Sequence, residues 1–388
     1  MDFWIRLITL IIVALVLFLG TTTAFAYLTL FERRLLARLQ HRVGPNRAGP
    51  NGFFQPLADA VKLFFKEDIT PTQADKVVYT IAPALAMIPA ILLFAVIPFG
   101  AYLDLSWLLG ESTRVVPLQF TDINVGVLFL LSVTSIGVYG ITLGGWSSNN
   151  KYSMLGGIRS AAQLISYELA LGLSILVAIM LTAAPAQQAG YPYPACNVMF
   201  PNEAYSALST CRIVESQAGW WNIFKPTGLI AFCVFWLAST AEVVRAPFDL
   251  VEAEQELVGG YNTEYSSMKF ALFFMAEYIK LIAVSAIGVT LFLGGWRGPG
   301  VDTLYSAGYP NIAALVSVGY FLLKLIFFLF LSVGVRATLP RFKYNQLMDL
   351  GWKRLLPLSL ALVAITAIGA VLTSGMNPYI AGLFGALR

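Results

Sequence analysis

Residues 355–376 read LLPLSLALVAITAIGAVLTSGM, an apolar run without a charged side chain. As an α-helix, a run of about 20 residues crosses the hydrocarbon core of a bilayer. Backbone polar groups cannot stay unpaired in hydrocarbon, so a spanning segment is either a helix or a strand of a closed barrel. This run lacks the alternation of polar and apolar residues that a barrel strand shows. It therefore predicts a transmembrane helix.

Seven further apolar runs occur along the chain, near residues 3–31, 77–102, 123–143, 159–183, 225–241, 268–293 and 311–335. The 388 residues are 58% hydrophobic and 12% charged, with a mean hydropathy of +0.73, which is typical of a membrane protein. The first run begins Met1-Asp2 with no basic n-region and is longer than a signal-peptide core, so we expect it to be retained. The sequence predicts an all-α, polytopic integral membrane protein, a single membrane domain over residues 1–388 with eight transmembrane helices.

Lysine and arginine residues are distributed unequally between the two sides of these spans. The loops after the first, third, fifth and seventh spans carry 17 of the 25, and the opposite side carries six. Basic flanks stay on the cytoplasmic side, so both termini are predicted outside. The loops at 32–76 and 242–267 are then inside and the loop at 184–222 is outside. A net charge of +4 explained by topology calls for no nucleic-acid partner.

Two of the three cysteines, Cys196 and Cys211, lie in the predicted outer loop, where thiols are readily oxidised. A disulfide between them would close a loop of about 15 residues and contribute about 3 kcal/mol. Cys233 lies within the fifth span. We predict a disulfide between Cys196 and Cys211, and two unpaired thiols are the alternative.

Residues for redox or hydrolytic chemistry are scarce. One histidine, His41, and three scattered cysteines exclude an iron–sulfur cluster, a zinc site and a Ser-His-Asp triad within this chain. No glycine-rich turn of a nucleotide-binding site follows a strand. We therefore predict no catalytic and no metal-binding residue, and any redox function requires electrons from another subunit.

The inside loop at 32–76 combines irregular and helical sequence. Residues 42–52 are rich in glycine and proline, whereas after them Leu57, Val61 and Phe64 share one helical face. This pattern predicts an interfacial amphipathic helix after the first span. It is either a strap on the membrane surface or the wall of a portal for a lipid-soluble substrate.

The inside loop at 242–267 is acidic, although an inside loop is normally basic. Its six carboxylates are Glu242, Asp249, Glu252, Glu254, Glu256 and Glu264. Carboxylates crowded near a low-dielectric boundary raise one another's pKa, which favours proton exchange near neutral pH. A solvated acidic face or a docking surface for a basic partner is the alternative.

Ionisable residues also occur within the spans, where each costs about 2.5–3.5 kcal/mol on insertion scales and indicates a function. Glu277 and Lys280 are three residues apart, so they could neutralise each other on one helix. Lys324 is a further example. Glu168 has no such partner on its helix, so its partner is another helix, water in a cavity or its own proton. A neutral acid hydrogen-bonded between helices is the alternative without a function.

Several motifs together resemble a known family. They are Leu30-Phe31-Glu32-Arg33-Arg34, Arg42-Val43-Gly44-Pro45-Asn46-Arg47, Pro56-Leu57-Ala58-Asp59, Lys66-Glu67-Asp68, Ser166-Tyr167-Glu168, Ala241-Glu242, Arg245-Ala246-Pro247-Phe248-Asp249, the run from Glu252 to Gly260, and Pro340-Arg341-Phe342. In this order, from about residue 25 to 355, they closely resemble the H subunit of bacterial complex I, and the mitochondrially encoded homologue is similar.

This resemblance implies a membrane subunit of the proton-translocating NADH:quinone oxidoreductase in the bacterial plasma (inner) membrane, with other complex I subunits of the membrane and peripheral arms as partners. It implies a chamber for quinone, the substrate, shared with two peripheral subunits; flavin and iron–sulfur clusters belong to partner subunits. The residues implied for the chamber and portal are Arg33, Arg38, Asp59, Lys62, Arg336 and Arg341. Those implied for the start of the proton path are Glu32, Glu168, Glu242, Arg245, Asp249, Glu252, Glu254, Glu256, Glu264 and Glu277.

Two other functions remain open at this point. One is the homologous membrane subunit of an energy-converting hydrogenase, whose soluble partners carry a nickel–iron site. The other is a free-standing ion or proton transporter that uses the same intramembrane acids.

Overall fold

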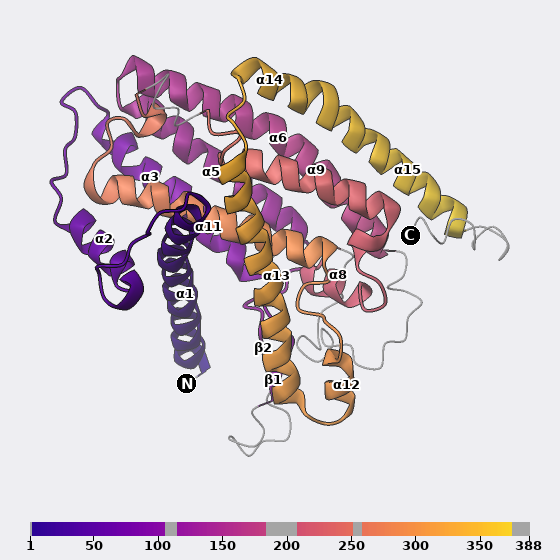
Figure 1. The fold of residues 1–388 in the computed structure, drawn as a ribbon. Coiled ribbons are helices and arrows are strands. Elements are labelled where there is room, and N and C mark those ends of the chain that lie inside the picture. Colours follow the sequence, from indigo (N-terminus) through magenta and orange to yellow (C-terminus); the bar gives the residue numbers. More distant parts are fainter. Residues whose placement is uncertain (1, 105–114, 184–207, 251–257, 375–388) are drawn as a thin grey trace.

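The fold is a bundle of long helices with one short hairpin (Figure 1). A computed structural model describes residues 2–104, 115–183, 208–250, 258–374 of the chain. The long helices are α1 (Asp2–Leu39), α3 (Lys76–Leu92), α5 (Gly126–Ser147), α6 (Lys151–Ala183), α9 (Pro226–Glu242), α11 (Ser267–Phe292), α13 (Pro310–Thr338) and α15 (Leu356–Ser374). Shorter helical elements are η1 (Pro50–Gly52), α2 (Gln55–Phe64), η2 (Leu93–Val96), α8 (Thr210–Ser216), η4 (Asn222–Phe224), η5 (Gly260–Asn262), α12 (Val301–Ser306), α14 (Tyr344–Asp349) and η6 (Leu350–Leu355).

The all-α, membrane-spanning fold class is confirmed. Within the described residues, seven helical segments are long and apolar enough to cross a bilayer. The fifth predicted span corresponds to α9, which has only 17 residues and ends at the polar Glu242. The number of eight spans and the outward orientation of both termini stay predictions.

Close packing between neighbouring spans depends on small residues. Helix α3 packs on α5, and α6 packs on both α5 and α9. A Cβ added at Gly140 of α5 would lie 2.5 Å from the backbone nitrogen of Ala86 in α3, so only glycine permits this approach. Gly145 of α5 meets Gly157 of α6 in the same way. Without a hydrophobic driving force in lipid, such close contacts stabilise the association of the helices.

Helix α11 lies at the centre of the bundle (Figure 1). It contacts α1, α3, α6, α9 and α13. From Tyr278 to Phe292, every residue of α11 except Lys280 is buried. A charged side chain at this place must be paired within the protein, because its neighbours keep it from bulk water and headgroups.

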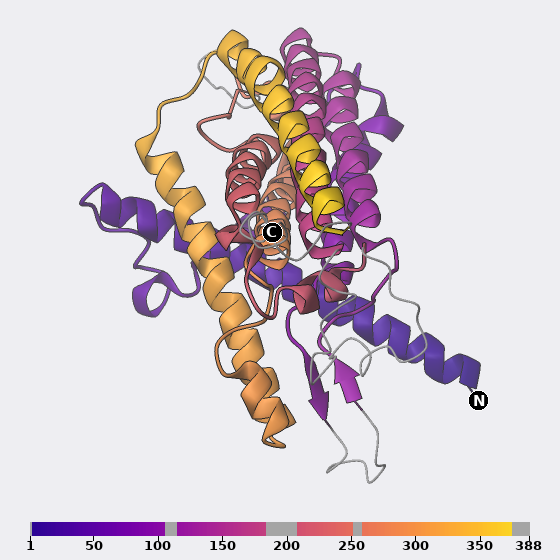
Figure 2. The ribbon, with the colours of Figure 1, turned by 90° about the vertical axis from the view of Figure 1, so that its right-hand side faces the viewer.

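Helix α2 lies beside α1, away from the main bundle (Figures 1 and 2). The Phe53 ring just before it packs on Tyr27 of α1, with ring centroids 5.1 Å apart. Leu57, Val61 and Phe64 are exposed on one face of α2. The predicted amphipathic helix is therefore confirmed, and its position at the membrane interface stays a prediction.

The opposite end of the molecule carries a hairpin of β1 (Tyr102–Asp104) and β2 (Val115–Pro117), which pair antiparallel with Leu103 opposite Val116. Helices α8 and α12 lie at this end as well (Figure 1). Cys211 of α8 is buried and disulfide-bonded. Cys196 lies outside the described residues, so its pairing with Cys211 stays a prediction.

Candidate functional site

Three polar contacts hold the chain after α9 within the bundle. The side-chain amide of Gln163 in α6 donates to the carbonyl oxygens of Ala241 and Phe248, at 2.8 and 2.9 Å. The backbone amide of Phe342 donates to the carbonyl of Pro247 at 3.1 Å. These bonds pair buried backbone groups and fix the segment that carries Arg245 and Asp249.

Arg245 is buried and lies between two carboxylates from different helices. Its Nε is 2.5 Å from an oxygen of Glu277 in α11, and its Nη1 is 3.2 Å from both oxygens of Glu32 in α1. Its guanidinium also lies 3.9 Å from the centre of the Tyr278 ring. Burial lowers the pKa of Arg245, but the charges of Glu277 and Glu32 outweigh burial and raise the pKa above its usual value. Arg245 is therefore a permanent cation.

Glu32 joins this cation to the end of α13. It is 3% exposed and forms a second ion pair with Arg336, at the last turn of α13. The Arg336 side chain is 36% exposed. The ion pairs Arg336–Glu32, Glu32–Arg245 and Arg245–Glu277 thus run from the surface into the bundle. We name these four residues the ion-pair row.

A second buried pair lies next to the ion-pair row. Lys280 of α11 places its Nζ 2.9 Å from an oxygen of Glu242, at the end of α9. The two side chains are 15% and 3% exposed. The spacing of Glu277 and Lys280 left open that they neutralise each other on one helix. In the structure each residue pairs with another segment instead, Glu277 with Arg245 and Lys280 with Glu242. Side chains three positions apart on a helix are near enough to interact, but here each one binds an oppositely charged side chain from a neighbouring segment.

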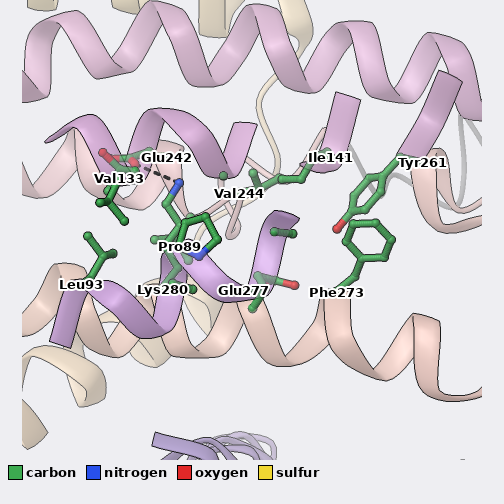
Figure 3. Close-up of a pocket in the computed structure, with 16 residues that line it drawn as sticks. Pro89, Leu93, Val133, Ile141, Glu242, Val244, Tyr261, Phe273, Glu277 and Lys280 are labelled. Carbon is green, nitrogen blue, oxygen red and sulfur yellow. Dashed lines mark ion pairs between the residues drawn. The ribbon is translucent and has the colours of Figure 1, made fainter. Parts of the chain in front are cut away.

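A partly enclosed cavity of about 50 Å³ lies between α3, α5, α9 and α11, and we name it the internal cavity. Glu242, Glu277 and Lys280 line it together with apolar side chains such as Leu93 and Val133. Figure 3 shows the Glu242–Lys280 pair at one end, the rings of Tyr261 and Phe273 at the other, and Glu277 between them. One water needs about 10–15 Å³ and two to four polar partners. The cavity therefore has room for a few waters between the row and the pair.

Glu168 of α6 is a further carboxylate near the Glu242–Lys280 pair. Ser135 of α5 donates a hydrogen bond to it, and the charges of Glu242 and Lys280 act on it electrostatically. Its partner is thus a hydroxyl from another helix, one of the possibilities that the sequence left open. Among the ion pairs of the described residues, none joins Glu168 to a cation of its own, which suits a carboxyl group that gains and loses a proton.

Replacement of Glu168 by Gln is expected to reduce proton pumping per electron by more than half while leaving assembly intact. Glutamine keeps an oxygen that can accept the bond from Ser135 but cannot titrate. Pumping in reconstituted vesicles and the amount of assembled complex measure the two effects. Ser135→Ala is the complementary control, because it removes this hydrogen bond and leaves the titratable carboxyl group. Wild-type pumping in Glu168→Gln would show that this acid takes no part.

The residues predicted for the chamber lie near the ends of the helices that the sequence predicts on the inside. Arg33 pairs with Asp59 of α2 at 2.6 Å, and Arg341 pairs with Asp249 at 3.0 Å. The side chains of Arg33 and Arg341 are nearly half exposed, which leaves them able to contact another molecule. Arg38 and Lys62 are exposed as well.

Glu264 lies apart from the ion-pair row. Its carboxylate accepts a hydrogen bond from the side-chain amide of Asn150 at 2.6 Å. Three further acids of the predicted proton path, Glu252, Glu254 and Glu256, lie outside the described residues. The structure thus brings together Glu32, Arg245 and Glu277, and separately Glu242 and Glu168, from the predicted set.

Sequence reasoning did not assign Ser135, Tyr278 or Lys280 to the proton path. The signal for Lys280 was present, since a lysine within an apolar span indicates a function. Tyr278 follows Glu277 directly, and its hydroxyl hydrogen-bonds Glu32. For Ser135 no signal existed, because serines are common in transmembrane helices and only the folded structure brings this one to Glu168.

Comparisons with known proteins place the chain among relatives of one kind. Residues 11–367 match the family model described as NADH dehydrogenase. An H-type subunit of NADH-quinone oxidoreductase from Geobacter sulfurreducens is 45% identical over 95% of this chain and 96% of its own. One from Koribacter versatilis is 46% identical over 93% of this chain and 96% of its own, and one from Deinococcus deserti is 47% identical over 92% and 83%. The chain therefore belongs to the NADH dehydrogenase family, as an H-type membrane subunit of NADH-quinone oxidoreductase.

Proposed function

We propose that this chain is the membrane subunit of a bacterial, proton-translocating NADH:quinone oxidoreductase that encloses the quinone chamber together with peripheral subunits. It works in the plasma (inner) membrane, with the ends of α1 and α13 that carry Arg33 and Arg336 on the cytoplasmic side. Flavin and iron–sulfur clusters belong to the partner subunits. Quinone is the substrate.

The ion-pair row carries this proposal. Arg336, at its outer end, is more than a third exposed and lies at the same end of the helices as Arg33 and Arg341. Glu277, at its inner end, lines the cavity that also contains Glu242 and Lys280. A change of charge near Arg336 can therefore act on Glu277 through a continuous series of ion pairs.

The chemistry of quinone suits such a row. Reduction of a quinone to the quinol takes up two electrons and two protons, so negative charge arises in the chamber before the protons arrive. In a medium of low dielectric constant this charge shifts the protonation of carboxylates several ångströms away. Glu168 and the Glu242–Lys280 pair are placed to take part, and Glu252, Glu254 and Glu256 extend the path in the family resemblance. No proton has to cross the membrane within this chain.

Arg33→Ala and Arg341→Ala are expected to lower kcat/KM for quinone about tenfold, the effect of one lost charge-assisted hydrogen bond of about 1.4 kcal/mol. Reduction of a hydrophilic artificial acceptor by NADH should stay at the wild-type level, because that reaction takes place in the peripheral arm. Lys353→Ala is the matched control. This lysine is 72% exposed and pairs with Asp349 on its own helix turn. Equal losses of both activities would mean that the substitutions impair assembly instead of the chamber.

A further inference from the structure

A second hollow lies on the predicted cytoplasmic side. Its volume is about 680 Å³, and polar residues dominate its lining, among them Gln73, Ser148, Asn150 and Glu264. A hollow of this size with these side chains holds many waters. We name it the polar pocket, to distinguish it from the internal cavity lined by Glu277.

Two aromatic residues, Tyr265 and Phe273, form a chain of contacts between the lining of the polar pocket and that of the internal cavity. The hydroxyl of Tyr265 lies 3.4 Å from Ser147 Oγ and also bonds Ser148, which lines the polar pocket. On its other side the Tyr265 ring packs edge-to-face on Phe273, with centroids 4.9 Å apart. Phe273 in turn lines the internal cavity. The rings of Tyr265 and Phe273 therefore lie between the polar pocket and the internal cavity.

The partition is closed in this structure. Phe273 is 2% exposed, and a Cβ added at Gly144 of α5 would lie only 2.9 Å from its Cζ atom. Tyr79 of α3 stacks on Tyr265 at 4.2 Å, which fixes that ring from behind. The Phe273 ring offers no hydrogen bond, so it interrupts any chain of waters between Tyr265 and the Glu277 carboxylate. Apolar constrictions of this kind close a pathway by excluding water.

We infer that Phe273 is a gate between the polar pocket and the internal cavity. When its ring turns aside, water from the cytoplasmic side reaches Glu277, which lies one helical turn further along α11 and lines the same cavity. The aqueous phase then supplies protons to the cavity directly, without passage through the quinone chamber. Glu264 and the hydroxyl of Tyr265 form the polar approach to this gate. The inference rests on the proposed function for its physiological meaning.

A cysteine in the internal cavity makes the gate measurable. Gly137 lines the cavity, and a Cβ added there meets no atom within 4 Å, so Gly137→Cys fits without strain. Cys233, which is exposed and free, is replaced by serine in the same chain. Silver nitrate is added to inverted membrane vesicles that contain the whole complex, because silver ion is small and binds thiolates. Alkylation after denaturation and peptide mapping then count the thiols at residue 137 that silver has not reached.

Adding Phe273→Ala is expected to accelerate silver modification of residue 137 at least tenfold. Phe270→Ala is the matched control, since Phe270 lies on the same helix, is half-buried and lines neither hollow. Phe273→Leu, a smaller change, is expected to give an intermediate rate, and it replaces Phe273→Ala if that variant does not assemble. Equal rates in the Phe273 and Phe270 variants would overturn the gate.

A hydrophobic quinone-site inhibitor separates the two routes of access. The rate of silver modification should not change with the inhibitor, because the polar pocket is not part of the chamber. A rate that falls to background with the inhibitor would overturn the inference, since silver then arrives through the chamber. Absence of NADH:quinone reductase activity from the parent complex would instead reject the proposed function, and the comparison between Phe273 and Phe270 would still decide the gate.

Discussion

Replacement of Arg245 by Met is expected to lower NADH:quinone reductase activity more than about 100-fold or to abolish assembly of the complex. Arg245 is the common partner of Glu32 and Glu277, and all three side chains are largely buried. Removal of one member of a buried ion pair leaves an uncompensated charge, at a cost of about 3–5 kcal/mol. Methionine has a similar length, so the loss reflects charge more than volume.

The double variant Arg245→Met, Glu277→Gln separates assembly from function. It removes the orphaned carboxylate, so the complex should assemble better than with Arg245→Met alone. Its quinone reductase activity should stay low, because the row is interrupted. The amount of complex, measured by reduction of a hydrophilic acceptor, and the quinone reductase activity per complex give the two answers. Wild-type activity in the single variant would refute a role for the ion-pair row.

Replacement of Lys280 by Met is expected to abolish proton pumping, to less than about a tenth of wild type. Lys280 is the cation 2.9 Å from Glu242, and both side chains are largely buried, so no solvent dipoles replace the lost charge. Glu242→Gln should have a similar effect on pumping, because it removes the titratable group of the same pair.

The variant with both changes, Lys280→Met and Glu242→Gln, completes a double-mutant cycle. Its stability should lie above that expected from the sum of the single variants, with a coupling energy of about 2 kcal/mol, because no charge remains unpaired. Pumping should remain absent in all three variants. Thermal stability of the purified complex and acidification of vesicles measure the two quantities. Additive losses of stability would show that Lys280 and Glu242 do not interact as a pair.

The spans were predictable because a bilayer imposes length and apolarity on each helix, whatever its neighbours are. The ends were less predictable. The first apolar run stops at Phe31, yet α1 continues to Leu39. The polar end of α1 is stable because Glu32 pairs with Arg245 and Arg336, which lie far from it in the sequence. The apolarity of a segment indicates that it contacts lipid. It does not indicate which contacts the segment makes with the rest of the protein.

The members of the site were predictable as residue types, but their partners were not. Arg245 and Glu32 are 213 positions apart, and nothing in spacing or charge links them. Glu277 and Lys280 illustrate the opposite case, in which spacing suggests a contact that the fold does not use. The cavity between Glu242 and Glu277 arises from four helices together, so no single segment predicts it.

Purification through a tag on this chain tests the central claim most directly. We expect a complex that contains flavin and several iron–sulfur proteins and that transfers electrons from NADH to quinone with acidification of the vesicle lumen. Nickel in the purified complex would instead indicate a hydrogenase. A chain that purifies alone and transports ions would contradict the account altogether.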